Sequence, residues 1–438
     1  MKATMKPHRL LGLLAWAAAA ALGTPATAQD LSWSGFGTLG YAQSNRDHTY
    51  QRYIDHSGGL ERDTVFGVQA DWRLGPQWSA TLQLKAAPSL KSDSRWDVVP
   101  AWAFVAWRPT NDWLLRVGRV RAPLYLYSES MDVGQTHDMA RLPTELYSVA
   151  PTTDIDGAYV TRSWALGETG DRELSLDAYH GAANTTARFW TRDGLPPVEP
   201  AGAQFKDVHV ELTGLALTLR QPDLVLRTSV HQARTRQRNG QALPVRFPFV
   251  PVGPGIGYYQ VSNSLPGPGV PTVGTIGNTI FSLGGEATLG GGWRVAGEFV
   301  RNQQHDTELA SDTKARYIAV FRQMGKFTPY LSVARLDSPA RSFDWYQRLT
   351  NPSLPGFIPG AAQLNAAQRM AGESIWLADQ HSVAVGSSYA LSPSMKLKGE
   401  WMRSRIGQMS RLVDTPPGSA TVSQQSIDVW SINLNFAF

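Results

Sequence analysis

Apolar and polar residues alternate along the last residues of this chain. The apolar positions are Trp430, Ile432, Leu434, Phe436 and Phe438, and the positions between them include Ser431, Asn433 and Asn435. Because successive side chains of a β-strand point to opposite faces, this period of two predicts a strand with one apolar and one polar face. The same alternation recurs at residues 66–74, 77–86, 173–178 and 395–401.

Sixteen such segments can be assigned, each of about 9–15 residues, which is long enough to cross a bilayer at a tilt. Strands of soluble proteins are shorter, with about 5–6 residues. The predicted strands are residues 31–41, 62–74, 76–87, 96–108, 111–121, 155–164, 172–181, 206–220, 222–233, 277–290, 291–303, 312–324, 326–336, 378–391, 394–406 and 424–438.

The connections between these strands alternate between short and long. The short ones are Leu74–Pro76, Arg108–Asp112, Ala165–Asp171, Gln221–Pro222, Leu289–Gly292, Met324–Lys326 and Leu391–Ser394. The long ones are 42–61, 88–95, 122–154, 182–205, 234–276, 304–311, 337–377 and 407–423. This alternation is typical of outer-membrane barrels, which have short periplasmic turns and long extracellular loops. The Pro- and Gly-rich stretch 240–276 is compatible with an ordered or a disordered loop.

Aromatic residues gather at the short connections, where Trp72, Trp78, Trp107 and Trp113 flank the first two. Amphipathic rings prefer membrane interfaces, so this pattern predicts a girdle at one end of a barrel. We therefore predict an all-β fold, a transmembrane antiparallel β-barrel of about 16 strands with short periplasmic turns and long extracellular loops. The alternative is an array of soluble β-sandwiches.

The N-terminus has the pattern of a Sec signal peptide. Lys2, Lys6 and Arg9 precede an apolar run of about 14 residues, and Ala26 and Ala28 supply the small residues of a cleavage site. We expect residues 1–28 to be removed and residues 29–438 to form the barrel, with an inward-folding third loop near 122–154. The chain has 41 Lys+Arg and 36 Asp+Glu. Cleavage leaves 38 against 36, so its charge gives no reason to expect a nucleic-acid partner.

Motifs for enzymatic chemistry are missing from the sequence. It contains no G-x-S-x-G, H-E-x-x-H or G-x-x-x-x-G-K-[ST] pattern, and its nine His show no metal-ligand spacing. Zero Cys exclude a thiolate zinc site. We therefore predict no enzymatic activity, no catalytic residues, no metal site and no cofactor. A nucleophile–His pair on the barrel rim remains the alternative.

The long connection 122–154 carries most of the candidate functional residues. Its charged residues include Glu129, Asp132, Asp138, Arg141 and Glu145. The basic residues expected on the inner wall are Arg73, Lys85, Arg116, Arg294, Lys396 and Lys398. A 16-stranded barrel leaves room for an aqueous channel. If the loop folds inward, its acids would face these bases and form a narrow passage with a transverse electric field. The alternative is a solvated surface loop.

Three short motifs give a family resemblance. The segment Arg116–Leu124 (RVGRVRAPL) resembles Gram-negative porins, particularly the phosphate-selective porin O and P superfamily. Thr328–Tyr330 (TPY) and Asn435–Phe438 (NFAF) are similar to porins generally. The residue-level match covers about 30 positions. In that superfamily a strand ending in Gly and a basic residue leads through a proline into the loop that enters the pore. Strict alternation places Arg119 on the lipid side unless Gly118 marks a bulge.

The resemblance implies a homotrimeric diffusion channel in the outer membrane of a Gram-negative bacterium. It also implies that the terminal Phe438 is an assembly signal for the barrel assembly machinery. Phosphate-selective members have a basic constriction, whereas the third loop here is acidic, so phosphate selectivity is not carried over.

We expect a passive porin for small hydrophilic solutes or ions, with outer-membrane lipid around it. The alternatives are a channel specific for an anion, phosphate or a sugar, and a non-conducting barrel enzyme or surface-binding protein.

Overall fold

The computed structural model describes residues 31–438 except 151, 168–169, 196–198 and 352–353. The predicted signal peptide, residues 1–28, lies outside the described residues.

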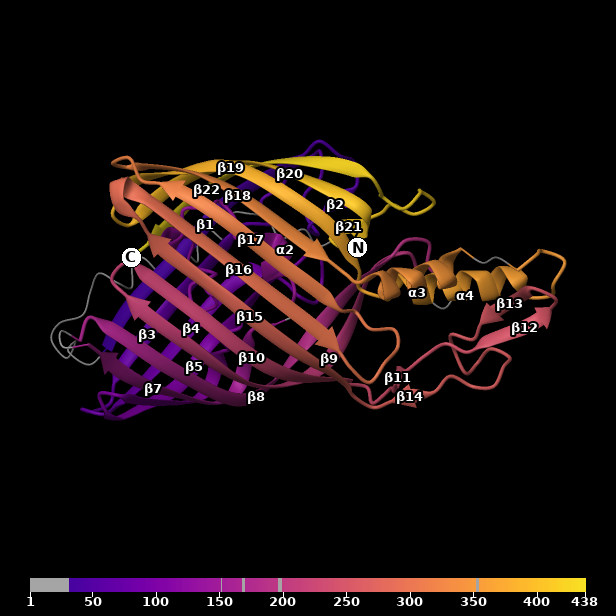
Figure 1. Ribbon diagram of the computed structural model, residues 1–438, viewed down its shortest axis with the longest axis horizontal. Helices are drawn as coiled ribbons and strands as arrows, with labels where there is room; N and C mark the ends of the chain where they lie inside the picture. The colour runs from indigo at the N-terminus through magenta and orange to yellow at the C-terminus, as the bar shows by residue number, and fades with distance from the viewer. Residues whose placement is uncertain (1–30, 151, 168–169, 196–198, 352–353) are drawn as a thin grey trace.

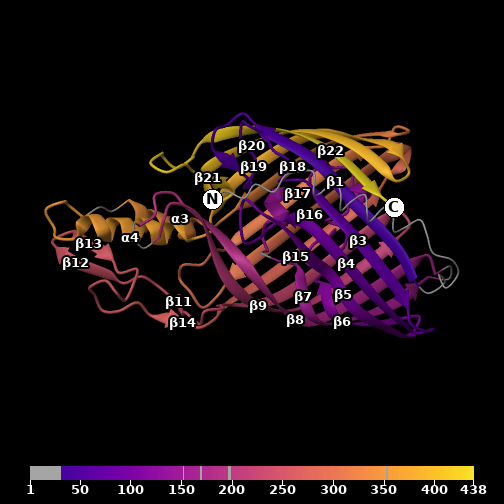
Figure 2. The same ribbon diagram turned by 180° about the vertical axis from the view of Figure 1, so that it is seen from behind.

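Sixteen antiparallel strands form one closed barrel, as predicted (Figure 1). Each strand pairs with the next one along the barrel, and β1 closes the sheet against β22. The strands are β1 (Leu31–Ser44), β3 (Val65–Arg73), β4 (Trp78–Pro88), β5 (Trp96–Thr110), β6 (Trp113–Arg121), β7 (Asp154–Leu166), β8 (Arg172–Thr191), β9 (Gly202–Gln221), β10 (Leu224–Gln237), β15 (Ile276–Thr288), β16 (Trp293–Gln304), β17 (Thr313–Arg322), β18 (Phe327–Asp337), β19 (Ala378–Ser392), β20 (Met395–Ser410) and β22 (Gln425–Ala437). Strands β15–β18 face the viewer in Figure 1 and β3–β5 in Figure 2.

At the final strand, β22, apolar side chains lie on the outer face of the barrel and polar side chains on the inner face. Trp430 and Ile432 are 50% and 53% exposed, whereas Asn433 and Asn435 are buried. The last residue, Phe438, exchanges two backbone hydrogen bonds with Gly35, at 2.9 and 3.0 Å. These bonds join the two ends of the barrel sheet at the edge where the short turns lie (Figure 1).

Strands β8 and β9 are longer than predicted, at 20 residues each. Their pairing continues without a register shift from Ala182 opposite Glu211 to Thr191 opposite Gly202. The predicted loop 182–205 is therefore mostly strand. The segment 182–188 is rich in Ala and Thr and lacks a clear apolar face, so periodicity does not reveal it.

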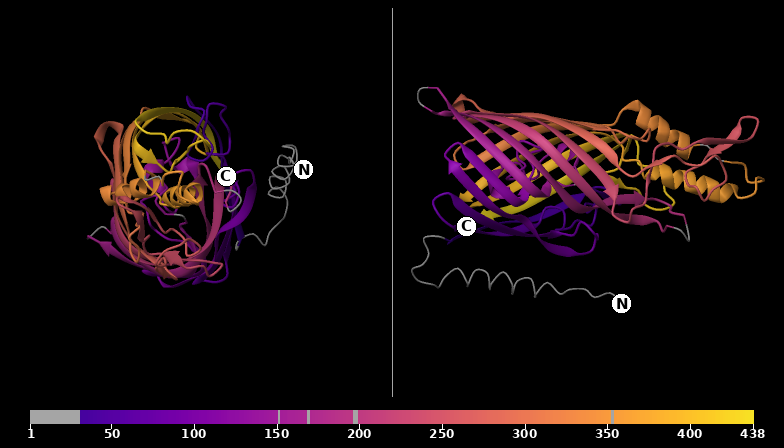
Figure 3. Two further views of the ribbon diagram at one scale, coloured as in Figure 1. Left: turned by 90° about the vertical axis from the view of Figure 1, so that its right-hand side faces the viewer. Right: turned by 90° about the horizontal axis from the view of Figure 1, so that it is seen from below.

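The long loops lie at the opposite end and hold further structure (Figure 3). The short strands β2 (Thr49–Tyr50) and β21 (Val413–Asp414) pair with each other, as do β11 (Leu243–Pro244) with β14 (Thr272–Val273), and β12 (Phe249–Gly253) with β13 (Ile256–Tyr259). Helices α3 (Ala340–Thr350) and α4 (Ala361–Glu373) project beyond the strand ends together with β12 and β13. Of the two predicted alternatives for the stretch 240–276, the structure shows the ordered loop, because its short strands pair into two small sheets.

A 3₁₀ turn, η2 (Gly290–Gly292), forms the β15–β16 connection. Within the described part of the chain, no helix has the length and apolar character needed to cross a membrane.

Candidate functional site

The connection between β6 and β7, here called the third loop (residues 122–153), runs inside the barrel. Its 3₁₀ turn η1 (Gly134–Thr136) contacts β1 and β22, and its short helix α2 (Thr144–Tyr147) contacts β16, β17 and β18. A Cβ atom on Gly134 would overlap the side chains of Asn435 and Thr38. The loop backbone therefore lies directly against the inner wall at this point.

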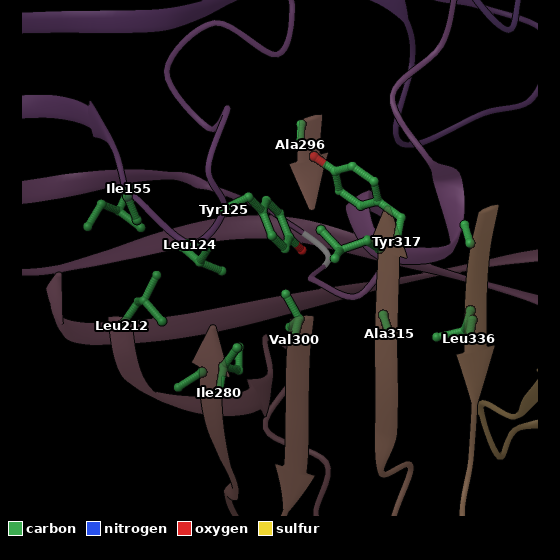
Figure 4. Packing of buried hydrophobic residues seen from close by; sticks show 14 of the residues in the cluster. Leu124, Tyr125, Ile155, Leu212, Ile280, Ala296, Val300, Ala315, Tyr317 and Leu336 are labelled. Atoms are coloured by element: carbon green, nitrogen blue, oxygen red, sulfur yellow. The ribbon is translucent and has the colours of Figure 1, made fainter. Parts of the chain in front are cut away.

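One side of the third loop packs as an apolar core. Leu124, Tyr125 and Leu146 are almost fully buried. In Figure 4, Leu124 and Tyr125 lie among side chains of the inner wall. The wall residues shown there include Leu212, Ile280, Ala296, Val300, Ala315, Tyr317 and Leu336, from β9, β15, β16, β17 and β18. Sequence reasoning did not identify this apolar sector, although the run Pro123-Leu124-Tyr125-Leu126-Tyr127 is unusually apolar for a loop.

Polar wall groups hold the same stretch of the loop. The Glu298 carboxylate accepts hydrogen bonds from the Leu126 backbone N–H (2.7 Å), the Tyr147 hydroxyl (2.5 Å) and the Tyr317 hydroxyl (3.0 Å). The Arg227 guanidinium donates to the Tyr125 carbonyl at 3.0 Å. Leu126, Tyr147 and the Tyr125 carbonyl belong to the loop, so detaching the loop would leave Glu298 and Arg227 buried with fewer hydrogen-bond partners.

Asp132 of the third loop forms two direct ion pairs, close to the point where the loop leaves β6. Its carboxylate lies 2.9 Å from the Lys85 ammonium on β4 and 2.8 Å from the Arg121 guanidinium at the end of β6. Burial alone would raise the pKa of Asp132, but the two cations outweigh burial and hold its pKa well below the ordinary value. Arg121 also pairs with Asp154, at 2.6 Å.

Asp138 makes a second ion cluster, close to the edge with the short turns. Its carboxylate pairs with Arg294, lies 3.0 Å from the Lys396 ammonium and accepts a hydrogen bond from Ser388 at 2.7 Å. Burial opposes ionisation here too, but Lys396 and the other donors lower the pKa of Asp138. The neighbouring Gln135 donates to the Pro393 carbonyl in the β19–β20 turn at 3.0 Å. The third loop thus extends almost the full depth of the barrel.

The remaining predicted loop residues have different surroundings. Glu129 is partly exposed, 3.9 Å from Arg227. Glu145 is buried and accepts a hydrogen bond from Gln380 at 2.9 Å, while its other oxygen has no partner among the described residues. Arg141 forms a two-pronged ion pair with Asp63, whose shortest distance is 2.5 Å.

The basic residues predicted for the inner wall also fall into two groups, those that contact acids of the third loop and those that do not. Lys85, Arg294 and Lys396 contact acids of the third loop, as described above. Lys398 donates instead to two loop carbonyls, those of Gly134 (2.6 Å) and Met139 (3.0 Å). Arg116 lies over the Tyr159 ring at 4.1 Å, and Arg73 is exposed at the end of β3.

Arg119 lies on the outer face. The strand register passes Gly118 without a shift, and Arg119 lies 3.5 Å from Asp156. Gly118 has a φ of 129° but marks no bulge, so the alternation holds at Arg119.

Sequence reasoning missed two residues just before β3, Arg62 and Asp63, which it placed inside a strand. The strand begins only at Val65, and both residues belong to the first loop (residues 45–64). The charged run Glu61-Arg62-Asp63 breaks the apolar alternation and could have indicated this boundary. Asp63 forms an ion pair with Arg141. The positive charge of Arg141 lowers the pKa of Asp63, although burial alone would raise it. Arg62 donates to the neutral side chains of Gln51 (3.1 Å) and Thr144 (3.2 Å).

A cavity of about 410 Å³ lies between the first and third loops. Its charged lining residues are Arg52, Arg62, Arg141 and Lys398 against Glu61, Asp63 and Asp132. Arg62 and Lys398 make hydrogen bonds to neutral acceptors only, among the interactions of the described residues. Burial and repulsion from Arg141 lower the pKa of Arg62 to about 10, so it remains protonated at neutral pH. The charged residues of the cavity lining are thus four basic and three acidic ones.

The sequence predicted acids of the loop and bases of the wall facing each other across an open passage. The structure differs from that arrangement. Asp132 and Asp138 touch their basic partners, so these pairs fasten the loop and largely cancel each other's field. The charges that border open space are those of the cavity lining. No group of three or more potential His, Cys, Asp or Glu metal ligands occurs within the described ranges.

Comparisons with known proteins agree with the barrel architecture. No family model matches the chain, and no curated protein matches it. Among solved structures, OprB of Pseudomonas putida at high pH aligns with a TM-score of 0.51 at 9% identity, over 93% of this chain and 94% of that chain. Outer-membrane expressed OmpT of Vibrio cholerae (TM-score 0.49, 13% identity, 95% and 99% covered) and an anion-selective porin from Comamonas acidovorans (0.48, 11%, 93% and 99%) are also similar. At these identities the likeness to OprB shows the fold.

Proposed function

We propose that this chain is a passive porin of the Gram-negative outer membrane, through which small hydrophilic solutes diffuse. The observation that carries this proposal is the third loop, which is fixed to the inner wall along its length beside a cavity lined by charged residues. Such a loop would narrow the lumen of a closed barrel, and the cavity would form part of the polar passage. Diffusion through it involves no reaction and needs no cofactor.

The outer surface supports the placement in a membrane. Exposed apolar side chains such as Leu331, Val385 and Ile432 cover the outer face, and Trp78, Trp113 and Trp293 lie exposed at the short-turn end. An apolar band with aromatic girdles is what a bilayer requires of a barrel. By resemblance to porins, we propose in addition a homotrimer whose protomers are recognised during assembly through Phe438.

We propose a modest preference for anions. Asp132 and Asp138 of the third loop are in direct contact with bases, whereas Arg62 and Lys398 beside the cavity have only neutral partners among the described residues. A passing anion therefore meets uncompensated positive charge. The same feature favours an anion-specific channel as the second candidate function.

Single-channel recording of the refolded protein in a planar bilayer tests these proposals. Stepwise conductance supports a pore, and a reversal potential of the anion-selective sign under a KCl gradient supports the preference for anions. A conductance that saturates and is blocked by one class of anion would favour the specific channel over the general porin. A folded barrel without conductance would refute the porin proposal and assign the function to the extracellular loops.

A further inference from the structure

Four basic residues lie side by side on four consecutive strands of the barrel. The sheet register places Arg316 on β17 opposite Arg335 on β18, Arg335 opposite His381 on β19, and His381 opposite Arg405 on β20. Directly opposed residues of antiparallel strands have Cβ atoms about 5 Å apart. These four residues therefore form one continuous row across the sheet, which we call the basic row.

The basic row lies on the outer face of the barrel. Ile318, Val333 and Val383, two residues from members of the row on the same strands, are exposed apolar side chains of the lipid-facing surface. All four members of the row are exposed as well. Two residues along a strand return to the same face, so the row is directed outward as these apolar residues are.

The height of the row corresponds to the outer headgroup layer. Arg335 lies eight residues from Phe327, an exposed aromatic residue at the short-turn end of β18. Eight residues span about 27 Å along a strand, or about 20 Å along the axis of a barrel with strands tilted by about 40°. Because the apolar band of such barrels is about 25 Å tall, the row lies near its extracellular edge. The outward-facing Trp401 and Trp430, which are directly opposed, lie near the same edge.

Other cations on the same outer face extend the row. Arg301 on β16 is opposite Lys314 on β17, and Arg403 precedes Arg405 by two residues. The acids on this face are few. Asp337 lies 3.2 Å from Arg316 and 3.0 Å from Arg335, Asp428 lies 2.8 Å from Arg403, and Asp379 accepts a hydrogen bond from the Gln408 backbone N–H at 2.9 Å.

Three of these cations lack a partner within the part of the chain that the structure describes. Among the interactions of the described residues, Arg301, Lys314 and Arg405 form no ion pair or side-chain hydrogen bond. Like charges directly opposite each other destabilise a sheet, so the opposed Arg301 and Lys314, and Arg405 in the basic row, favour anions from outside the chain. At this height, above exposed aliphatic side chains, the available anion is the headgroup of a lipid.

We propose that the basic row and its neighbours Arg301, Lys314 and Arg403 bind the phosphate groups of an anionic lipid in the outer leaflet. The guanidinium groups match phosphate oxygens in charge and geometry, and the acyl chains of the same lipid cover Ile318, Val333 and Val383. This inference rests on the placement of the barrel in the outer membrane but not on its conductance.

The test replaces the three unpartnered cations, with Arg301→Gln, Lys314→Gln and Arg405→Gln in one chain. Because these side chains contact no acid among the described residues, their loss breaks no ion pair of that part of the chain. The matched control carries Arg246→Gln, Arg348→Gln and Arg369→Gln, which remove the same charge from the extracellular loops. Binding of lipid A, a lipid with two phosphates, to the protein in detergent micelles is titrated and followed by native mass spectrometry.

We expect the row variant to bind lipid A on the order of a hundredfold more weakly than the parent chain, and the control to bind it equally well. Unchanged affinity in the row variant, or an equal loss in the control, would overturn the proposal. So would equally tight binding of dephosphorylated lipid A, or displacement of lipid A by millimolar inorganic phosphate, which would identify a site for soluble phosphate. Single-channel conductance of the same variants is measured in parallel, so that failure of the porin proposal is recognised separately.

Discussion

Replacing Arg62 with glutamine removes an uncompensated positive charge from the wall of the cavity. Its guanidinium donates to Gln51 and Thr144, both neutral, and its pKa of about 10 keeps it charged at pH 7. A glutamine retains an amide that can donate to Thr144. The substitution therefore changes the electrostatic potential in the passage more than its shape.

The size of the effect follows from the size of the cavity. A sphere of about 410 Å³ has a radius of about 5 Å, so an ion in the cavity passes within about 5 Å of the lining. At that distance a unit charge contributes about 0.8 kcal/mol in water, and about 0.5 kcal/mol after screening by 0.1 M salt. The energy has opposite signs for anion and cation, so their energies differ by about 1 kcal/mol. Arg62→Gln should then lower the anion-to-cation permeability ratio about fivefold.

The assay is the reversal potential of single channels under a tenfold KCl gradient, with 0.1 M salt on the dilute side. Arg73→Gln serves as the matched control, because Arg73 is exposed at the end of β3 and does not line the cavity. It should change the ratio by less than twofold. If Arg62→Gln leaves the reversal potential unchanged, or if the control shifts it as much, ions do not pass beside Arg62 and the proposed route is wrong.

Three further perturbations address the attachment of the third loop. Arg141→Ala leaves the buried Asp63 carboxylate without its partner and should weaken the attachment by about 3–5 kcal/mol, measured as larger fluctuations of open-channel current that Arg348→Ala does not produce. Gly134→Val should push the loop off Asn435 and raise the conductance, whereas Gly75→Val, in a turn with open space around it, should not; equal conductance in both variants would contradict the close packing. Burial and the nearby Lys398 lower the pKa of His137 to about 4. As the pH falls from about 6.5 to 4, a detached loop gains a proton that the attached loop does not. The attachment should therefore weaken by about 3 kcal/mol over this window, and His137→Gln should abolish the resulting rise in conductance.

The sequence determined the barrel because every strand separates two different environments. Alternation at Trp430–Phe438 and at its counterparts reports a lipid face and a lumen face at each residue, so all sixteen strands and seven short turns could be assigned from local pattern alone. The residues of the candidate site were predicted in part for a related reason. Charged side chains on the polar face of a strand, such as Lys85 and Lys396, must point into the lumen.

Only the tertiary structure determined which groups those charged side chains contact. Asp132 and Asp138 lie 47 and 258 positions from Lys85 and Lys396, and only the path of the third loop inside the barrel brings them into contact. That path depends on packing of Leu124, Tyr125 and Leu146 against wall residues from five other strands, which leaves no periodic signal. Arg62 and Lys398 became the uncompensated charges because loop carbonyls and neutral side chains, rather than acids, happen to reach them. Period-two patterns record the environment of a residue, whereas its partners are fixed by contacts between segments distant in the chain.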